Sequence, residues 1–264
     1  KYAAAICRGS ADASEYYDGK PFEADRPAVL TVPTTAGTGS EVTQVSVMNR
    51  GEEKKTINHP SLLPLAAIVD PLLTLSVPPR TTMITGLDAL AHALEGFWSV
   101  HHQPITDLYA VEAVRLVLEN LETAFRDGQN IEARTNMSYA ALLAGMAFAQ
   151  PKTAGCHACS YPLAMDYHLP HGEACAFTLQ SFVLVNADAR LEDLCRKAGL
   201  SGTAELAERI DALKALAGLK ARLSEIGCTD IEKLARESAA HPLMKNNPVK
   251  MDESMLSDLF RALA

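Results

Sequence analysis

Four side chains of the types that bind metal ions occur as two pairs, Asp88 with His92 and His157 with His171. The first pair lies in the segment TGLDALAHALEGFW, whose apolar spacing predicts a helix. Two residues that are four apart on a helix project from the same face. One carboxylate and three imidazoles suit a divalent transition metal such as iron(II) or zinc. The sequence therefore suggests a metal-dependent enzyme.

The composition of the chain limits the classes of protein to which it can belong. The 264 residues are 48% hydrophobic, which is enough for the core of one large domain or two smaller ones. The net charge of −8 argues against a nucleic-acid partner. No apolar stretch reaches the roughly 18 residues that a membrane span needs, and the start lacks the features of a signal peptide. Six cysteines in a chain of this length do not suggest a disulfide framework, so we expect a reduced, cytoplasmic protein.

The pattern of apolar residues changes near Pro78-Pro79. Before this point, residues 1–9 look like the end of a helix and residues 10–26 like turns, and β-branched residues predict a buried strand over 28–35. Further strands are expected near 42–49 and over 65–71. After this point, helical spacing covers 82–99, 104–126, 131–149, 172–187, 189–198, 203–215, 217–226 and 230–238, with a last helix capped by an Asp within 251–264. We expect strands and turns first, then a helical domain.

Five segments resemble the iron-containing, or group III, alcohol dehydrogenases and occur in the order of that family. They are PTTAGTGSEVT (33–43), LPLAAIVDPLLTLSVPP (63–79), TGLDALAHALEGFWS (85–99), QPITDLYAVEAVRLV (103–117) and LPHGEACAFTL (169–179). The resemblance implies a multi-domain α+β protein. Residues 1–79 would be the remnant of an α/β dinucleotide-binding domain, and residues 80–264 an all-helical, dehydroquinate synthase-like metal-binding domain. The active site would lie in the cleft between them.

The resemblance also implies ligands and an activity. The metal, Fe²⁺ or else Zn²⁺, would be held by Asp88, His92, His157 and His171. The cofactor, NAD or NADP, would contact Thr34, Thr35, Gly37, Thr38, Ser40 and Lys54. The reaction would be hydride transfer between the nicotinamide and a small alcohol or aldehyde, in an enzyme that forms a homodimer.

Two positions bear on the substrate. Where most family members carry a second histidine near the nicotinamide, this chain has Tyr161, which is either a catalytic group or part of the pocket wall. Lys152 stands beside the third metal ligand, and its ammonium would suit an anionic substrate tail, although a solvated loop lysine is an equal alternative. The surrounding residues resemble a subgroup that reduces phosphonoacetaldehyde. Lys152 and Tyr161 are the predicted catalytic residues.

Other interpretations remain open. Lys1 to Ala4 resemble the point just after the family's glycine-rich phosphate-binding loop, so we expect roughly a hundred upstream residues to be absent. The chain could then be an inactive metal-binding fragment. A metal-dependent hydrolase is a weaker alternative, because hydrolysis has no use for the cofactor loop. The remaining histidines and the pair Cys156 and Cys159 are expected to be structural or incidental.

Overall fold

The computed structural model describes residues 1–23, 26–51 and 53–264 of the chain. The later part is helical, and several helices begin at a short polar side chain that satisfies backbone N–H groups of the first turn. Asn130, Asp188 and Asp252 each accept a hydrogen bond from the N–H three residues ahead, which confirms the predicted Asp cap of the last helix. The helices are α3 (Pro79–Trp98), α4 (Pro104–Arg126), α5 (Ile131–Phe148), α6 (Gly155–Tyr167), α7 (His171–Val185), α8 (Ala189–Lys197), α9 (Thr203–Leu216), α10 (Ile231–Ala240) and α11 (Glu253–Arg261).

The first part of the chain contains short helices and strands. They are α1 (Tyr2–Ile6), α2 (Ala13–Tyr17), β1 (Leu30–Thr31), β2 (Val45–Arg50), β3 (Glu53–Asn58) and β4 (Ala66–Ala67). β1 and β4 pair in parallel, and β2 and β3 form an antiparallel hairpin in which Val45 is opposite Asn58. Short 3-10 segments lie at η1 (Ser40–Val42), η2 (Pro60–Leu62), η3 (Pro71–Thr74), η4 (Leu223–Ile226) and η5 (Pro242–Asn246).

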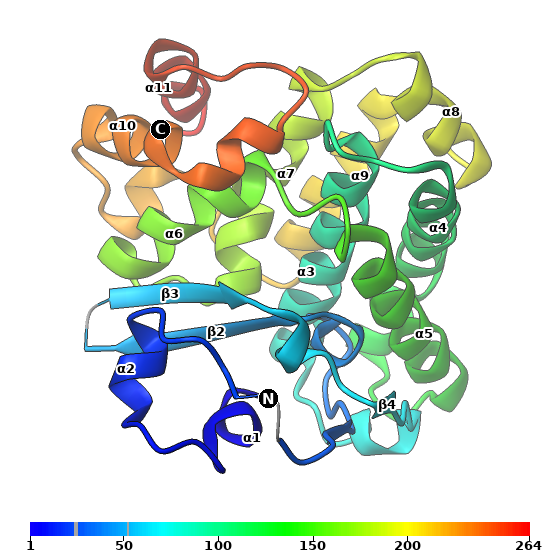
Figure 1. The fold of residues 1–264 in the computed structure, drawn as a ribbon. Coiled ribbons are helices and arrows are strands. Elements are labelled where there is room, and N and C mark those ends of the chain that lie inside the picture. The colour runs from blue at the N-terminus through cyan, green and yellow to red at the C-terminus, as the bar shows by residue number, and fades with distance from the viewer. Residues whose placement is uncertain (24–25, 52) are drawn as a thin grey trace.

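The hairpin β2–β3 lies along one side of the helical layer, and α1 and α2 lie on the far side of the hairpin (Figure 1). α3 runs through the helical layer and packs against α4, α5 and α7. The N-terminus is near the hairpin, and the C-terminus is at the opposite end of the molecule (Figure 1). The fold therefore places a short strand layer against one end of a helical bundle.

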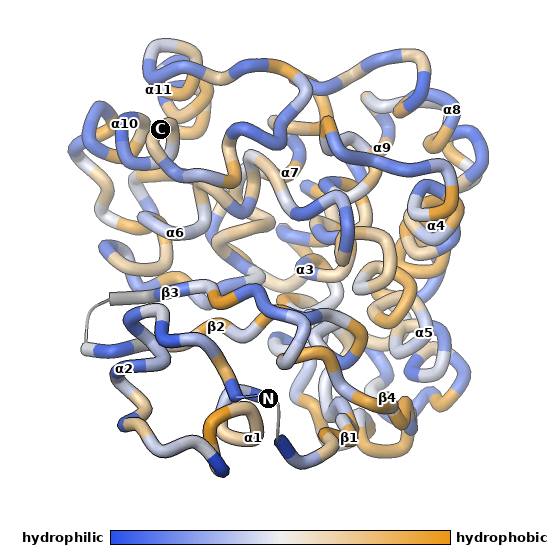
Figure 2. Tube along the Cα trace, viewed as in Figure 1, coloured by the Kyte–Doolittle hydropathy of each residue, from blue (hydrophilic) through white to orange (hydrophobic). Residues whose placement is uncertain are grey.

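The hydrophobic core is centred on α3. Leu87, Leu90 and Leu94 have no exposed surface, and hydrophobic stretches of α4 and α5 lie alongside (Figure 2). A helix that is buried on nearly every side should be apolar all round. Asp88, His92 and Glu95 break this rule, since they are 3%, 5% and 0% exposed. Buried polar groups need partners or a ligand, so these side chains locate the candidate site. In the described part of the chain, no helix is long and apolar enough to cross a membrane.

The strand predictions were wrong in extent and in burial. The strand expected over 28–35 is reduced to β1, and the strand expected over 65–71 is reduced to β4. Leu30, which is paired with Ala66, and Leu65, which precedes β4, are 60% and 74% exposed, and hydrophobic residues are visible around β4 in Figure 2. Parallel strands are normally covered on both faces. Within the described residues each of these two strands pairs only with the other. The apolar segments of the sequence are therefore longer than the strands that form.

Two helix assignments also differ from the structure. Residues 217–226 do not form a helix except for the short segment η4, because Gly218 adopts a left-handed conformation (φ +61°) just after α9 and ends it. α6 had no predicted counterpart. Its polar and apolar residues are not separated onto opposite faces, and Pro162 interrupts the pattern, so the sequence shows no amphipathic face there. β3 and α2 were likewise not predicted.

Gly39 holds the loop before η1 against α5. It adopts φ +58°, and an added Cβ would lie 2.3 Å from the Cα of Gly145. We expect Gly39→Ala to lower the free energy of unfolding by about 2–4 kcal/mol, since it combines backbone strain with overpacking. Urea denaturation followed by circular dichroism measures this change. Gly218→Ala is the matched control, because Gly218 has a similar φ but open space around it. Equal losses in the two variants would contradict the packing argument.

Candidate metal centre

The four predicted metal ligands lie together between α3, α6 and α7. The Nε2 atoms of His92 and His157 are 3.1 Å apart. Oxygen atoms of Asp88 lie 3.8 Å from His92 Nδ1, 3.8 Å from His157 Nε2 and 3.9 Å from His171 Nε2. Two ligands of one ion with bonds of 2.0–2.2 Å are separated by about 3.0–3.5 Å. The distances from Asp88 to the three imidazoles exceed that range by a few tenths of an ångström, and the group of donor atoms that all lie within 4.8 Å of one another contains Asp88, His157 and His171 but not His92. The four side chains therefore lie near one another, and three of them approach the spacing around a single cation.

Buried atoms without partners support this fit. Among the residues that the structure describes, Asp88 Oδ1 and His92 Nδ1 are buried and accept or donate no hydrogen bond. An unpaired buried carboxylate oxygen is costly unless a cation or donor satisfies it. The chemistry of the donor set, one carboxylate and three imidazoles, matches a divalent transition metal. The residues present thus fit a bound cation.

Electrostatics favour the charge states that metal binding needs at two of these positions. Burial opposes ionisation of Asp88, but the adjacent imidazoles of His92, His171 and His157 hold its pKa below the usual range. Burial lowers the pKa of His92 to about 4, so this imidazole is neutral at pH 7 and offers a lone pair. Burial also opposes a charge on His157, but the neighbouring Cys175 and Glu95 raise its pKa. Metal binding must displace that proton.

Glu95, which the sequence analysis did not single out, orients His157. Its Oε2 contacts His157 Nδ1, which turns the Nε2 atom toward His92 and Asp88. Its Oε1 accepts hydrogen bonds from the backbone N–H groups of Ala154 (3.0 Å) and Cys156 (2.7 Å) at the start of α6. One carboxylate therefore caps α6 and fixes the ring of a metal ligand. The sequence did contain one indication of this role, because Glu95 is an acidic residue three positions after His92 in a helix that is otherwise apolar.

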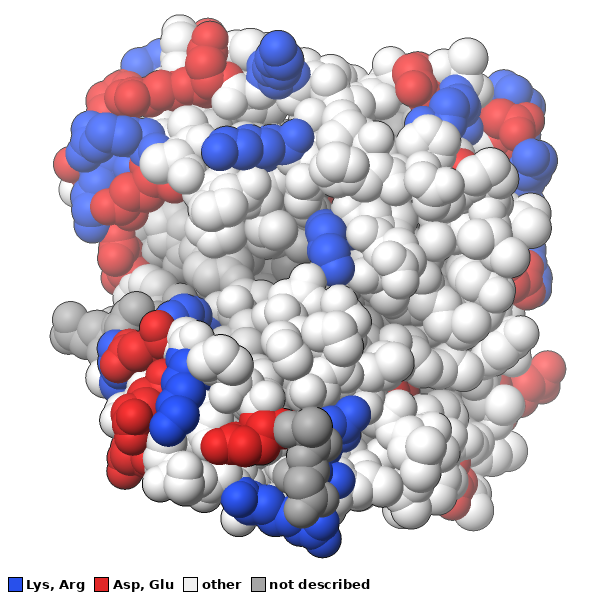
Figure 3. Space-filling view, viewed as in Figure 1, with Lys and Arg blue, Asp and Glu red and all other residues white. Residues whose placement is uncertain are grey.

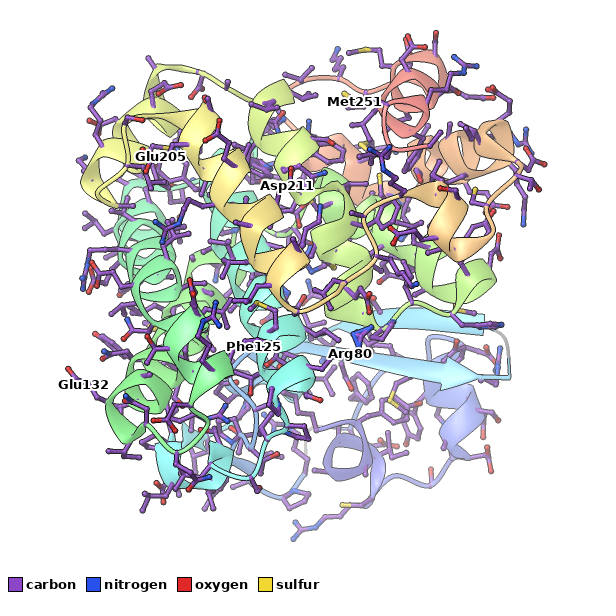
Figure 4. The ribbon with its side chains drawn as sticks, turned by 180° about the vertical axis from the view of Figure 1, so that it is seen from behind. Arg80, Phe125, Glu132, Glu205, Asp211 and Met251 are labelled. Atoms are coloured by element: carbon purple, nitrogen blue, oxygen red, sulfur yellow. The ribbon has the colours of Figure 1, made fainter. Side chains whose placement is uncertain are left out.

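The start of α7 is held close to α3, which places His171. A Cβ on Gly172 would lie 2.4 Å from the carbonyl oxygen of Ile84, so only glycine allows this approach. The next residue, Glu173, is buried and accepts a 2.7 Å hydrogen bond from Arg80, which Figure 4 labels in the first turn of α3. These contacts tie the two helices together at the site.

A cavity of about 1060 Å³ opens over the metal ligands. Its walls come from the hairpin β2–β3 on one side and from α3, α5, α6, α7 and η5 on the other. Figure 3 shows this face hollowed between the hairpin and the helices, with most charged side chains gathered toward the edges. The cavity is large enough for part of a nucleotide together with a small organic molecule.

Tyr161 and Lys152 both line this cavity. The Tyr161 hydroxyl lies 2.6 Å from Thr56 Oγ1 of β3, and its ring packs on His241 with centroids 4.1 Å apart. Lys152 has a left-handed backbone (φ +71°), and its Nζ donates to the carbonyl oxygen of Ala149. Burial lowers the pKa of Lys152. His241, expected to be surface or structural, caps η5 but also lines the cavity, which the sequence analysis missed.

Only some of the predicted cofactor residues line the cavity. Thr38 and Ser40 line the cavity, whereas Thr34, Thr35 and Gly37 are not among its lining residues. Gly37 instead packs against α3, where an added Cβ would lie 2.8 Å from Thr85 Cβ. The backbone of Lys54 belongs to β3, but its side chain lies outside the part of the chain that the structure describes, so its role stays a prediction.

The cysteines are free thiols throughout the described residues, and Cys156 and Cys159 are buried in the core. Neither belongs to the group of metal donors found among the described residues, and their structural role stays a prediction. Cys175 does belong to that group, and the sequence analysis overlooked it. Its position four residues after His171 on α7 was the signal, since such residues share a helix face.

Comparison with known proteins identifies the family. The model of the Fe-containing alcohol dehydrogenase family, C-terminal, matches residues 82–264, and that of iron-containing alcohol dehydrogenase matches residues 1–71. The chain belongs to the iron-containing alcohol dehydrogenase family, as its motifs predicted, and the expected fold class is confirmed.

Two relatives and one solved structure show how similar the chain is to individual proteins of this family. The chain is 34% identical over 250 residues to long-chain-alcohol dehydrogenase 1 of Geobacillus thermodenitrificans, covering 89% of this chain and 63% of the relative. It is 34% identical over 254 residues to sulfoacetaldehyde reductase of Bilophila wadsworthia, covering 89% and 65%. The crystal structure of sulfoacetaldehyde reductase from Bifidobacterium kashiwanohense in complex with NAD⁺ superposes with a TM-score of 0.96 at 41% identity, covering 100% and 72%. The chain thus spans just under two thirds of the length of these curated relatives.

Proposed function

We propose that this chain carries the metal centre and part of the cofactor site of an NAD(P)-linked alcohol dehydrogenase or aldehyde reductase. The observation that carries the proposal is the convergence of Asp88, His92, His157 and His171 at the cavity that the hairpin closes. In this proposal residues 1–79 contribute to nucleotide binding and residues 80–264 bind the metal. Iron(II) is the proposed ion, with zinc as the alternative, and the proposed assembly is a homodimer in the cytoplasm.

When bound, the cation supplies Lewis-acid polarisation of a substrate oxygen, and the nicotinamide supplies the hydride. The protein's own contribution is to hold the reacting groups in place and to exclude water from the buried wall around Asp88 and His157. Thr38 and Ser40 offer hydroxyls at the cavity for the cofactor. Tyr161, hydrogen-bonded to Thr56, offers a hydroxyl that can hold or pass a proton near the substrate.

We propose a small aldehyde with an anionic tail as the substrate class. Lys152 lines the cavity that contains the metal ligands, and an ammonium suits phosphonate or sulfonate oxygens. The bond to Ala149 engages one of the three N–H donors of this group. The sequence context favours phosphonoacetaldehyde, and the two relatives named as sulfoacetaldehyde reductases favour the sulfonate.

The test is a metal-loaded sample mixed with NADH or NADPH and then with an aldehyde. We expect quenching or enhancement of nicotinamide fluorescence on binding. Oxidation of the reduced cofactor should then follow with phosphonoacetaldehyde or sulfoacetaldehyde, and more slowly with propionaldehyde. Binding of one metal per chain without any cofactor binding would favour the inactive fragment. Cleavage of esters without a cofactor would favour the hydrolase.

Replacement of Lys152 tests the substrate class. Lys152→Ala should raise KM about 10- to 100-fold for the anionic aldehydes, the range expected for loss of a charged hydrogen bond, and leave KM for propionaldehyde nearly unchanged. Steady-state kinetics of the two substrates measure this ratio. Lys152→Arg, which keeps the charge, is the control and should retain part of the preference. An equal change for charged and uncharged aldehydes would contradict the assignment.

A further inference from the structure

A fifth potential donor lies at the metal centre. The thiol of Cys175 is fully buried, and its Sγ atom lies 3.9 Å from both ring nitrogens of His171. Ligand atoms of Asp88, His157, His171 and Cys175 all lie within 4.8 Å of one another. The group therefore contains a complete set of four donors without His92.

From these positions we infer that Cys175 is an additional, sulfur ligand that this centre offers to thiophilic metals such as zinc. The inference rests on the metal centre proposed above and goes beyond it by adding a donor of different chemistry. Around a tetrahedral zinc ion, a sulfur and a nitrogen ligand are separated by about 3.6 Å, which is close to the 3.9 Å seen between Cys175 and His171.

A second observation points to a ligand at the same place. Asp88 is 3% exposed and its Oδ1 atom has no hydrogen-bond partner among the described residues. This oxygen lies 3.8 Å from His157 Nε2 and 3.9 Å from His171 Nε2, the two imidazoles that also border Cys175. Cys175 does not line the cavity, so its thiol faces the centre from inside the protein. If Cys175 binds the metal from inside the protein, the side of the metal that faces the cavity stays open to substrate.

The centre then has two overlapping donor sets. Asp88, His157 and His171 are common to both, and either His92 or Cys175 completes the four. A hard or borderline ion such as iron(II) suits the set with three imidazoles, whereas zinc also binds thiolate strongly. On sulfur binding the thiol loses its proton to solvent, because a coordinated thiol is deprotonated.

Cobalt(II) substitution of the purified chain tests the inference, since a cobalt–thiolate bond gives an intense near-ultraviolet charge-transfer band. We expect this band in the unchanged protein, its loss in Cys175→Ser, and its retention in Cys159→Ser, a control at a buried thiol outside the donor group. Cys175→Ser should also weaken zinc binding about tenfold while changing iron(II) binding about twofold or less, as measured by chelator competition.

The outcomes separate this inference from the proposed function. One cobalt per chain without a charge-transfer band would overturn the sulfur ligand and leave the metal centre intact. A chain that binds no cobalt, iron or zinc would overturn both. A band that persists in Cys175→Ser would also contradict the inference, because the sulfur would then come from another cysteine.

Discussion

His157→Ala should abolish stoichiometric metal loading. His157 is central to the centre, since its Nε2 atom lies 3.1 Å from that of His92 and 3.8 Å from Asp88. Its removal leaves a gap in the middle of the donor set and takes away the ring that Glu95 orients. Elemental analysis of the purified variant after incubation with iron(II) measures the change, and we expect the metal content to fall from about one per chain to background.

His101→Ala is the matched control for this experiment. His101 lies in the exposed turn between α3 and α4, away from the donor group, so its loss should leave the metal content unchanged. Circular dichroism shows whether each variant keeps its helices. A folded His157→Ala protein with undiminished metal would disprove the ligand assignment.

Glu95→Gln should weaken metal binding about 10- to 100-fold, the usual effect of losing the group that orients a metal-binding histidine. The glutamine is nearly the same size and can still accept hydrogen bonds from the start of α6. Its NH₂ group would instead donate to His157 Nδ1, which would favour the tautomer protonated on Nε2. That proton occupies the lone pair needed for the metal. Competition with a chromophoric chelator measures the affinity.

Lys214→Gln separates this effect from a general loss of stability. Lys214 is also buried, and its ammonium donates hydrogen bonds to Gln180 and Asp211, away from the metal ligands. Both variants should unfold at lower urea concentration, but only Glu95→Gln should lose most of its metal affinity. Equal affinities in Glu95→Gln and the unchanged protein would show that Glu95 serves α6 alone.

The sequence predicted the long helices well because their apolar periodicity and polar caps are local signals. It also singled out four side chains that lie near one another in the structure, since Asp88 and His92 share a helix face and the family motifs named His157 and His171. That these four bind a metal stays a prediction. Glu95 and Cys175 were not predicted, because their importance depends on which helices pack together. α6 was missed because its apolar residues gather on no single face of the helix.

The strands were overpredicted for a different reason. The sequence of residues 28–35 and 65–71 is apolar enough for buried strands, but a strand becomes long only where neighbours supply hydrogen bonds and cover its faces. In the described residues, β1 and β4 have only each other. Leu30 and Leu65 remain exposed as a result. The pattern of apolar residues therefore showed the composition of these two segments, but it did not predict how long β1 and β4 would be.

The most direct test of the central claim is anomalous diffraction at the iron absorption edge from crystals of the iron-loaded chain. We predict one strong peak among Asp88, His92, His157 and His171, at about 2.0–2.3 Å from their ligand atoms. A peak on other residues would contradict the account. So would the absence of a peak in crystals that elemental analysis shows to contain one iron per chain.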